Sequence, residues 1–286
     1  MTRPAYLTDE AIALFIRAAL AEDIGEGDHS TLATVPADQI ARARLLVKDE
    51  GVAAGVELAS ILFKQIDPSL QMSMLINDGD DIRKGDVIFE VNGHARAILS
   101  GERLVLNCMQ RMSAIATKTH HLSKLIEGTP AQLLDTRKTT PNFRLMEKWA
   151  VAIGGGRNHR FALYDMIMLK DNHIDVAGGI ALAVANAVDY LKKQSKKLLI
   201  EVETRSLDEV KAALDTHAVD IIMLDNMNLV DMKAAVKLIA GKCKTEASGG
   251  ITESTLRSVA ECGVDYISVG ALTHSVKSLD LSLKIF

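Results

Sequence analysis

The sequence predicts an α/β protein in which a small mixed domain precedes a barrel of parallel strands. The C-terminal half alternates six short apolar runs with amphipathic helical segments, a pattern typical of a parallel sheet covered by helices. Five of the six runs end in a polar or charged residue, and barrel enzymes hold their chemistry at this position. This favours a barrel over an open doubly wound sheet.

The composition argues against several classes of protein. With 286 residues, of which 48% are hydrophobic and 24% charged, the chain can fill a core, so neither a disulfide miniprotein nor a disordered chain is expected. The net charge is −4 and the pI is about 6.1, without the basic surplus that nucleic-acid or anionic-membrane partners require. We therefore expect no nucleic acid and no membrane among the partners.

The cysteines and the N-terminus indicate the cytoplasm. Cys108, Cys243 and Cys262 are widely spaced and form no CxxC or zinc-ligand pattern. The first residues contain no long apolar stretch, and no run approaches the roughly 18 apolar residues of a membrane span. We expect a cytoplasmic protein without structural disulfides.

The N-terminal part reads as an α+β unit. Apolar residues fall on one stripe between Thr8 and Asp23, which predicts an opening helix with acidic residues in its first turn. Short β-type runs follow, such as Arg44–Val47 and Asp86–Val91, and glycines separate them.

A long helix is expected from Ser100, as its N-cap, to about Ile126. Arg103 would then lie in the first turn, where a cation opposes the helix dipole. An arginine beside free N–H groups suits a carboxylate or phosphate. A surface arginine without a ligand is an equally good interpretation.

Beyond this helix the pattern becomes strand, then helix, repeated. Amphipathic segments such as Leu207–Leu214 and Thr252–Glu261 separate the strands. The six predicted strands are Gln132–Thr136, Met166–Lys170, Leu198–Glu203, Asp220–Asp225, Lys244–Ser248 and Asp265–Gly270.

Positive charge gathers between Arg137 and Lys170. This stretch has seven Lys or Arg residues against two acids, within a chain that is negative overall. A solvated surface is the simpler interpretation. The first cations follow one strand and Lys170 ends the next, however, so several of them would point at one barrel mouth and form an anion pocket. His159 lies beside Arg160 in the same stretch.

Two acids, Glu203 and Asp225, end neighbouring strands. They are either salt-bridge partners for the lysines of the same mouth or ligands of Mg²⁺ or ribose hydroxyls that stabilise a developing cation. The glycine-containing segments Ser248–Ile251 and Val269–Ala271 follow the last two strands, where barrels frequently bind phosphate through loop amides.

Several linked motifs, in order along nearly the whole chain, resemble the quinolinate phosphoribosyltransferase family. The N-terminal Gly/Asp loop Asp23–Thr31 also resembles that family. The motifs are Glu102–Asn107, Asp135–Pro141, Asn158–Arg160, Leu169–His173, Glu201–Glu203, Leu224–Asn226, Ala247–Gly250 and Val269–Ser275. One departure is Asn142–Phe143, where many members would have a glycine.

The resemblance implies a reaction and a domain organisation. Quinolinate and phosphoribosyl pyrophosphate would give nicotinate mononucleotide, pyrophosphate and CO₂ with Mg²⁺, in NAD biosynthesis. Residues 1–113 would form an N-terminal α/β sandwich joined by residues 276–286. Residues 114–275 would form a C-terminal six-stranded parallel α/β barrel.

The resemblance also implies roles for single residues. The two carboxylates of quinolinate would be held by Arg137, His159, Arg160, Lys170 and an Arg103 that a second subunit donates, so the active site would need a homodimer; assembly into hexamers stays open. Thr136 would also bind substrate. Lys138, Glu203 and Asp225 would be catalytic, and Glu203 and Asp225 would also hold Mg²⁺. The 5′-phosphate would lie on Ser248, Gly249, Gly250, Val269, Gly270 and Ala271.

Three other functions compete with this one. The chain could be a paralogue on the same scaffold, such as the molybdenum-locus protein related to the family or an enzyme for another pyridine carboxylate. A strand-end Lys170 also suits a Schiff-base aldolase. The third alternative is an anion-binding protein without catalysis.

Overall fold

A computed structural model describes residues 3–286, which divide into two compact units. The first contains the described chain up to His120 together with Lys138–Gly155 and Ala271–Phe286. The second contains His121–Arg137 and Gly156–Gly270. Each unit is built on its own sheet.

The first unit combines helices with a four-stranded antiparallel sheet. Its elements are α1 (Asp9–Asp23), α2 (His29–Thr34), β1 (Ile40–Val47), β2 (Gly51–Val52), α3 (Val56–Ile66), β3 (Gln71–Met74), β4 (Asp81–Ile82), β5 (Val87–His94), α4 (Ala95–Leu125), α5 (Arg144–Ile153), α11 (Ala271–His274) and β12 (Leu281–Ile285). Helix α4 continues past His120 to its end in the second unit.

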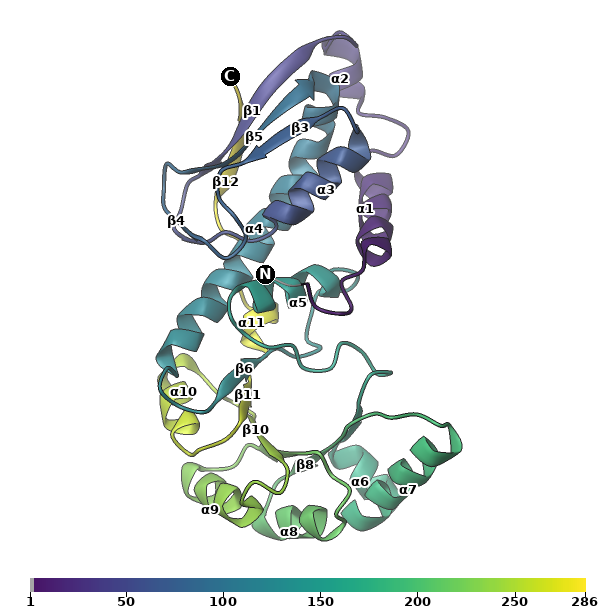
Figure 1. Ribbon diagram of the computed structural model, residues 1–286, viewed down its shortest axis with the longest axis vertical. Helices are drawn as coiled ribbons and strands as arrows, with labels where there is room; N and C mark the ends of the chain where they lie inside the picture. Colours follow the sequence, from purple (N-terminus) through teal and green to yellow (C-terminus); the bar gives the residue numbers. More distant parts are fainter. Residues whose placement is uncertain (1–2) are drawn as a thin grey trace. The chain divides into compact units, whose positions relative to one another are not determined.

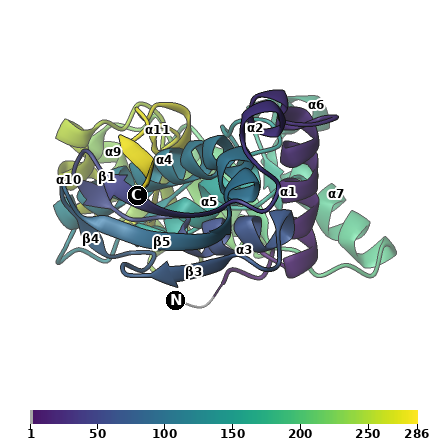
Figure 2. The same cartoon turned by 90° about the horizontal axis from the view of Figure 1, so that it is seen from above.

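The main sheet of this unit has the order β12-β1-β5-β3, with β1 paired to β5 and β12 in antiparallel register (Figures 1 and 2). Alternate residues of β1, among them Leu45, are completely buried, as expected for a sheet with one apolar face. Helix α3 packs on that sheet, because the rings of Phe63 and Phe89 meet edge to face at 6.0 Å.

The predicted opening helix and the two predicted strand segments are confirmed. Helix α1 starts after Thr8, whose side chain accepts the Ala11 N–H. Strand β1 contains Arg44–Val47 and starts before it, while β5 starts one residue after Asp86 and extends beyond Val91.

The predicted start of the long helix is wrong. Helix α4 begins at Ala95, directly after β5, and the Ala95 N–H donates to the Gln39 carbonyl. Ser100 lies inside the helix, and its hydroxyl donates to Asp28 at 3.2 Å instead of capping. Arg103 therefore lies beyond the first turn of α4, and its side chain is exposed. The argument from the helix dipole does not apply to it.

The second unit is a parallel sheet in the order β6-β11-β10-β9-β8-β7, which confirms all six predicted strands. Its helices lie along one face of the sheet (Figure 1). The elements are β6 (Gln132–Leu134), β7 (Ile167–Leu169), α6 (Asp171–Ala177), α7 (Ile180–Lys193), β8 (Ile200–Thr204), α8 (Leu207–Asp215), β9 (Ile221–Asp225), α9 (Leu229–Ile239), β10 (Lys244–Ser248), α10 (Glu253–Ala260) and β11 (Tyr266–Ser268).

A loop segment pairs with the outer edge of β6. Arg157 forms a parallel bridge with Leu134; its N–H donates to the Leu133 carbonyl at 2.8 Å, and its carbonyl accepts the Asp135 N–H at 3.1 Å. The next residues, Asn158–Arg160, consequently lie beside the carboxyl end of β6.

The two units differ from the expected division at residue 113. Residues 138–155 belong to the first unit because α5 and its ends pack on α4. A Cβ added to Gly154 would lie 2.4 Å from the Ala116 carbonyl oxygen, so only glycine fits there. The segment after residue 275 supplies β12, which pairs with β1.

No single helix between Arg3 and Phe286 is both long and apolar enough to cross a membrane. One pair, α6 with α7, passes on length and composition taken together, but it bends by 92°.

Candidate active site

The predicted site residues fall in both units. Arg103, Lys138 and Ala271 belong to the first. The second contains Thr136, Arg137, His159, Arg160, Lys170, Glu203, Asp225, Ser248, Gly249, Gly250, Val269 and Gly270.

Parallel strands bring the residues of the second unit to one edge of the sheet. Lys170 directly follows β7, while Asp225 and Ser248 end β9 and β10 and are partners in the register of these strands. The carboxyl ends of parallel strands meet at the same edge, so these side chains lie together as predicted. His173 accepts the Lys170 N–H at 3.0 Å, which makes it a structural residue at the start of α6.

Glu203 and Asp225 form a pair of carboxylates without a cationic partner. Neither forms a salt bridge with any residue from Arg3 onward, so they do not serve as ion-pair partners for lysines. Burial, followed by the negative charge of Asp225, raises the pKa of Glu203, and Lys170 opposes this shift. Two carboxylates that disfavour each other's charge are suited to a divalent cation.

Arg137 and Arg160 form the matching cationic region. Burial, followed by the charge of Arg137, lowers the pKa of Arg160, whereas Glu201 and Asp165 raise it. The Arg160 guanidinium also donates to the Met166 carbonyl at 3.3 Å. Two guanidinium groups that repel each other in a half-buried position are stabilised by a bound anion.

Glycine is required in the loop after β10. Gly249 has φ +91°, and a Cβ there would lie 2.3 Å from the Asn226 Oδ1 atom. Asn226 itself has φ +53°, donates its backbone N–H to the Ser248 carbonyl, and donates from its side chain to Asp225 at 2.7 Å. Asn226 thus joins the loops after β9 and β10, a role that was not predicted although the residue lies in a quoted motif.

Asp135 was also missed, and it fixes the segment beside β6. It is completely buried, accepts the Asn158 side-chain amide at 2.6 Å and accepts the His159 N–H at 2.9 Å. The residue directly before the predicted Thr136 and Arg137 therefore determines where His159 and Arg160 lie.

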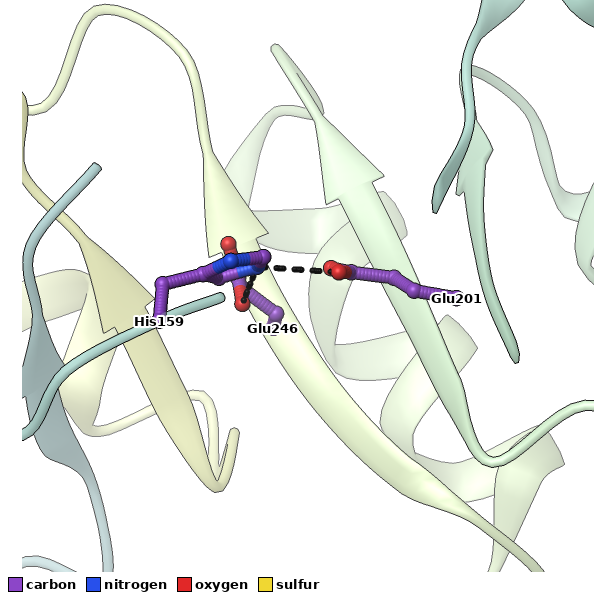
Figure 3. A group of neighbouring side chains, drawn as sticks. All are labelled: His159, Glu201 and Glu246. Carbon is purple, nitrogen blue, oxygen red and sulfur yellow. Dashed lines mark ion pairs between the residues drawn. The ribbon is translucent and has the colours of Figure 1, made fainter. Parts of the chain in front are cut away.

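Two further buried acids surround His159 (Figure 3). The His159 Nε2 atom lies 2.9 Å from Glu201 Oε2 and 3.4 Å from Glu246 Oε2. Both glutamate side chains are 0% exposed, and that of His159 is 8% exposed. Glu201 comes from β8 and Glu246 from β10, and we call these three residues the histidine cluster.

The histidine cluster retains a proton. Burial lowers the pKa of His159, but Glu201 and Glu246 outweigh burial and raise it to about 10. The Nδ1 atom already accepts the Arg160 N–H at 2.7 Å, so the ring proton is carried by Nε2, the nitrogen that faces the two carboxyls. Burial, which disfavours a charged carboxylate, correspondingly raises the pKa of Glu201.

The geometry of the histidine cluster does not fit a metal ion. His159, Glu201 and Glu246 are metal-ligand types with ligand atoms within 4.8 Å of one another. A metal on Nε2 would move the ring proton to Nδ1, against the Arg160 N–H that now donates to it. The cluster is therefore a proton-holding group.

One sequence signal for the histidine cluster was available. Glu201 lies two residues before Glu203 on the same strand, so both side chains are on one face. Glu246 is an acid inside a strand whose neighbours are buried. Acids at interior positions of a buried parallel strand are unusual and indicate a function.

In the first unit, Lys138 lies on a segment that buried groups fix. Its carbonyl accepts the Thr273 hydroxyl at 2.8 Å. Glu147, which is completely buried, accepts the backbone N–H of Thr140 at 3.0 Å and the guanidinium of Arg111 at 2.8 Å. The backbone of Lys138 is thereby fixed while its side chain is exposed.

The departure at Asn142–Phe143 has a local structural account. Asn142 has φ +63°, a conformation that glycine adopts freely and that asparagine tolerates better than most residues. Phe143 packs against Phe15 of α1 with ring centroids 5.6 Å apart.

Comparison with known proteins identifies the family. The family described as quinolinate phosphoribosyl transferase, C-terminal domain, matches residues 115–284, and the N-terminal domain of the same family matches residues 28–113. The chain belongs to the quinolinate phosphoribosyltransferase family. The two matches meet close to the boundary expected from the sequence.

Relatives of this phosphoribosyltransferase cover nearly its whole length. The chain is 49% identical to the chloroplastic nicotinate-nucleotide pyrophosphorylase of Oryza sativa, over 99% of this chain and 79% of the relative. It is 44% identical to the probable enzyme of that name from Bacillus subtilis, over 92% and 90%. The structure of NadC from Streptococcus pyogenes is 41% identical and superposes with a TM-score of 0.91 over 97% of both chains.

Proposed function

We propose that the residues at the ends of the parallel strands, with Lys138, carry out the reaction of this family. The chain is a pentosyltransferase that transfers phosphoribosyl from phosphoribosyl pyrophosphate to quinolinate with decarboxylation, giving nicotinate mononucleotide, pyrophosphate and CO₂. The observation that carries the site assignment is the pairing of a cationic region around Arg137 and Arg160 with a carboxylate pair at Glu203 and Asp225.

Quinolinate lies in the cationic region. Its two carboxylates are bound by Arg137, Arg160 and Lys170, with Thr136 and His159 lining the subsite beside them. The mutual repulsion of Arg137 and Arg160 supports this assignment, because a dianion removes an unfavourable interaction when it binds.

Phosphoribosyl pyrophosphate lies over the ends of β8 to β11. Lys138, Glu203 and Asp225 face its ribose and pyrophosphate. The 5′-phosphate accepts hydrogen bonds from the backbone N–H groups of the glycine loops. The glycine that the structure requires at position 249 supports this. The contributing residues are Ser248, Gly249, Gly250, Val269, Gly270 and Ala271.

The carboxylate pair fits Mg²⁺. Glu203 is half-buried, its pKa is raised partly by Asp225, and it has no salt bridge within the described chain, so a divalent cation would relieve its repulsion from Asp225. When bound, Mg²⁺ supplies positive charge that neutralises the pyrophosphate as it leaves.

The chemical steps need positioning and electrostatic stabilisation but no nucleophile from the protein. The bond from C1 of the ribose to pyrophosphate breaks, and the carboxylate of Glu203 stabilises the positive charge that develops on C1. The ring nitrogen of quinolinate then bonds to C1. The neighbouring carboxylate leaves as CO₂, its electron pair is taken up by the pyridinium, and the ring carbon receives a proton.

The assembly and location are further parts of the proposal. Arg103 is exposed on α4, where it is accessible to a second subunit, so we propose a homodimer in which it completes the partner's quinolinate subsite. Assembly of dimers into hexamers stays open. The acidic pI and the unpaired cysteines support a cytoplasmic location. Relatives are named as chloroplastic, mitochondrial or bacterial proteins.

Family membership favours this reaction over the three alternatives. A Schiff-base aldolase would need Lys170 as a nucleophile, and an anion-binding protein would need no carboxylate pair. The relatives named above are pyrophosphorylases rather than paralogues of another function.

The test is an assay with Mg²⁺, phosphoribosyl pyrophosphate and either quinolinate or nicotinate, in which nicotinate mononucleotide and CO₂ are both measured. We expect turnover with quinolinate alone and its loss in Lys138→Ala and Glu203→Ala. Absence of turnover by the pure dimer with either acid would overturn the proposal.

The division of the site is tested by Arg137→Ala. We expect quinolinate binding to be lost while binding of phosphoribosyl pyrophosphate is retained, as measured by calorimetry. Equal loss of both would contradict the assignment of Arg137 to one subsite.

A further inference from the structure

The histidine cluster is energetically unfavourable for folding. The four carboxyl oxygens of Glu201 and Glu246 are buried, and none of them forms a hydrogen bond with any residue from 3 to 286. Unsatisfied buried carboxyl oxygens are destabilising, and inward-facing positions of parallel barrels are ordinarily filled by branched apolar side chains. The two acids therefore need an explanation beyond folding.

A short series of contacts leads from these acids to the surface of the cationic region. Glu201 and Glu246 face the Nε2 atom of His159, and the opposite ring nitrogen, Nδ1, accepts the Arg160 N–H at 2.7 Å. The imidazole thus connects the two buried carboxyls to the backbone of Arg160.

Glu201 also acts on Arg160 through its charge. Its negative charge raises the pKa of the Arg160 guanidinium, whereas the charge of Arg137 lowers it. A buried acid near Arg160 therefore favours its charged guanidinium before the dianion arrives. The effect on Arg160 needs the charge of Glu201, and the ion pairs with His159 need the charges of both carboxylates.

We propose that Glu201 and Glu246 are positioning residues of the quinolinate subsite, which they orient from beneath through His159 and Arg160. The inference rests on the proposed function, because it names the substrate whose binding the two acids control. They touch no substrate, so they are expected to change the binding of quinolinate and leave that of phosphoribosyl pyrophosphate unaltered.

The experiment measures both KM values and kcat in Glu201→Gln and Glu246→Gln. Glutamine keeps the size and the acceptor oxygen but removes the charge. We expect the KM for quinolinate to rise about 10- to 100-fold, because small displacements of a binding group have large effects. We expect the KM for phosphoribosyl pyrophosphate to stay within about twofold, since the contacts of Glu201 and Glu246 lead to His159 and Arg160, which are assigned to quinolinate.

Asp265→Asn is the matched control. Asp265 is a partly buried acid directly before β11 that accepts the backbone N–H and the hydroxyl of Thr245 at the opposite, amino end of the sheet. Its replacement should lower the melting temperature and change neither KM. A rise in the quinolinate KM in this variant as well would mean that any loss of stability has that effect, and would overturn the proposal.

A second variant keeps the test independent of the folding of the glutamine variants. Asparagine at position 159 places its side-chain oxygen close to the position of Nδ1 and leaves nothing at Nε2, so His159→Asn removes the contact with Glu201. We expect a similar rise in the quinolinate KM, and a much smaller additional rise when Glu201→Gln is added, because only the effect of its charge on Arg160 then remains. Additive effects, or equal increases in both KM values, would contradict the proposal. An inactive wild-type enzyme would instead contradict the proposed function.

Discussion

Glu201 and Glu203 are two residues apart on β8 and face the same side, yet their surroundings differ completely. Glu201 is 0% exposed against an imidazole, while Glu203 is half-buried beside Asp225 at the strand end. The same contrast exists on β10 between Glu246 and Ser248. A step of about 6.6 Å along a strand separates the buried acids from the residues that we propose to contact the substrate. Depth, rather than residue type, decides the role of an acid here.

The largest expected effects distinguish Glu203 near the strand end from the buried Glu246. Glu203→Ala should lower kcat/KM by about 10²- to 10³-fold, because it removes charge stabilisation at the reacting carbon, and should leave the stability nearly unchanged. Glu246→Ala should lower the free energy of unfolding by about 3–5 kcal/mol, because it breaks a buried ion pair. Urea unfolding and steady-state kinetics on both variants provide the measurement.

The contrast between the two acids would be contradicted if Glu203→Ala and Glu246→Ala had the same effects on activity and stability. Glu253→Ala, which replaces an exposed acid of α10, serves as the control for both measurements and should change neither. A loss of stability in Glu203→Ala as large as that in Glu246→Ala would place both acids in the folding core.

The next largest effect is a pH dependence of the stability, which arises from the histidine cluster. The folded-state pKa of His159 is raised to about 10 from 6.5, so the stabilisation is fully present below pH 6.5 and is lost as the pH rises to about 10. The free energy of unfolding should fall across this range by up to about 1.4 kcal/mol per pH unit. Groups that face His159 are Glu201, Glu246 and the Arg160 backbone.

Glu246→Gln provides the comparison for the pH dependence. Removal of one carboxyl lowers the raised pKa, so the variant should lose stability less steeply between pH 7 and 10. Parallel curves for the two proteins, measured by urea unfolding at several pH values, would show that the slope arises elsewhere.

The smallest expected effect concerns the glycine loop after β10. Gly249→Ala forces a Cβ against Asn226 at φ +91°, so it should cost about 1–2 kcal/mol and weaken binding of phosphoribosyl pyrophosphate. Gly250→Ala is matched to it: φ is +60°, but the nearest atom to its Cβ would be 3.9 Å away. Equal affinities of the two variants, measured by calorimetry, would show that the contact with Asn226 has no role.

The parts of the molecule that local patterns determine could be predicted from the sequence. The six parallel strands and the carboxylates at their ends follow from apolar runs that end in a charged residue. The start of α4 could not be predicted, because it depends on the contact of Ala95 with Gln39, which is distant in the chain. The grouping of residues 138–155 with the first unit likewise depends on the fit of Gly154 against Ala116.

The candidate site divides in the same way. Arg137, Lys170, Glu203 and Asp225 all lie within three residues of a strand end, where the sequence alone indicates chemistry. Asp135 and Glu246 were missed because their roles depend on which residue lies opposite them across the sheet, and spacing along one strand does not contain that information.

Strand β12 is synthesised long after β1, the strand with which it pairs. Val47 of β1 pairs with Leu281, so about 230 residues must be added before this edge of the antiparallel sheet is covered. At translation rates of about 5–20 residues per second, that edge stays open for about 10–50 s, and open strand edges are prone to aggregate. The strands of the parallel unit all precede β12, so the last strand to be synthesised belongs to the first sheet rather than to the second.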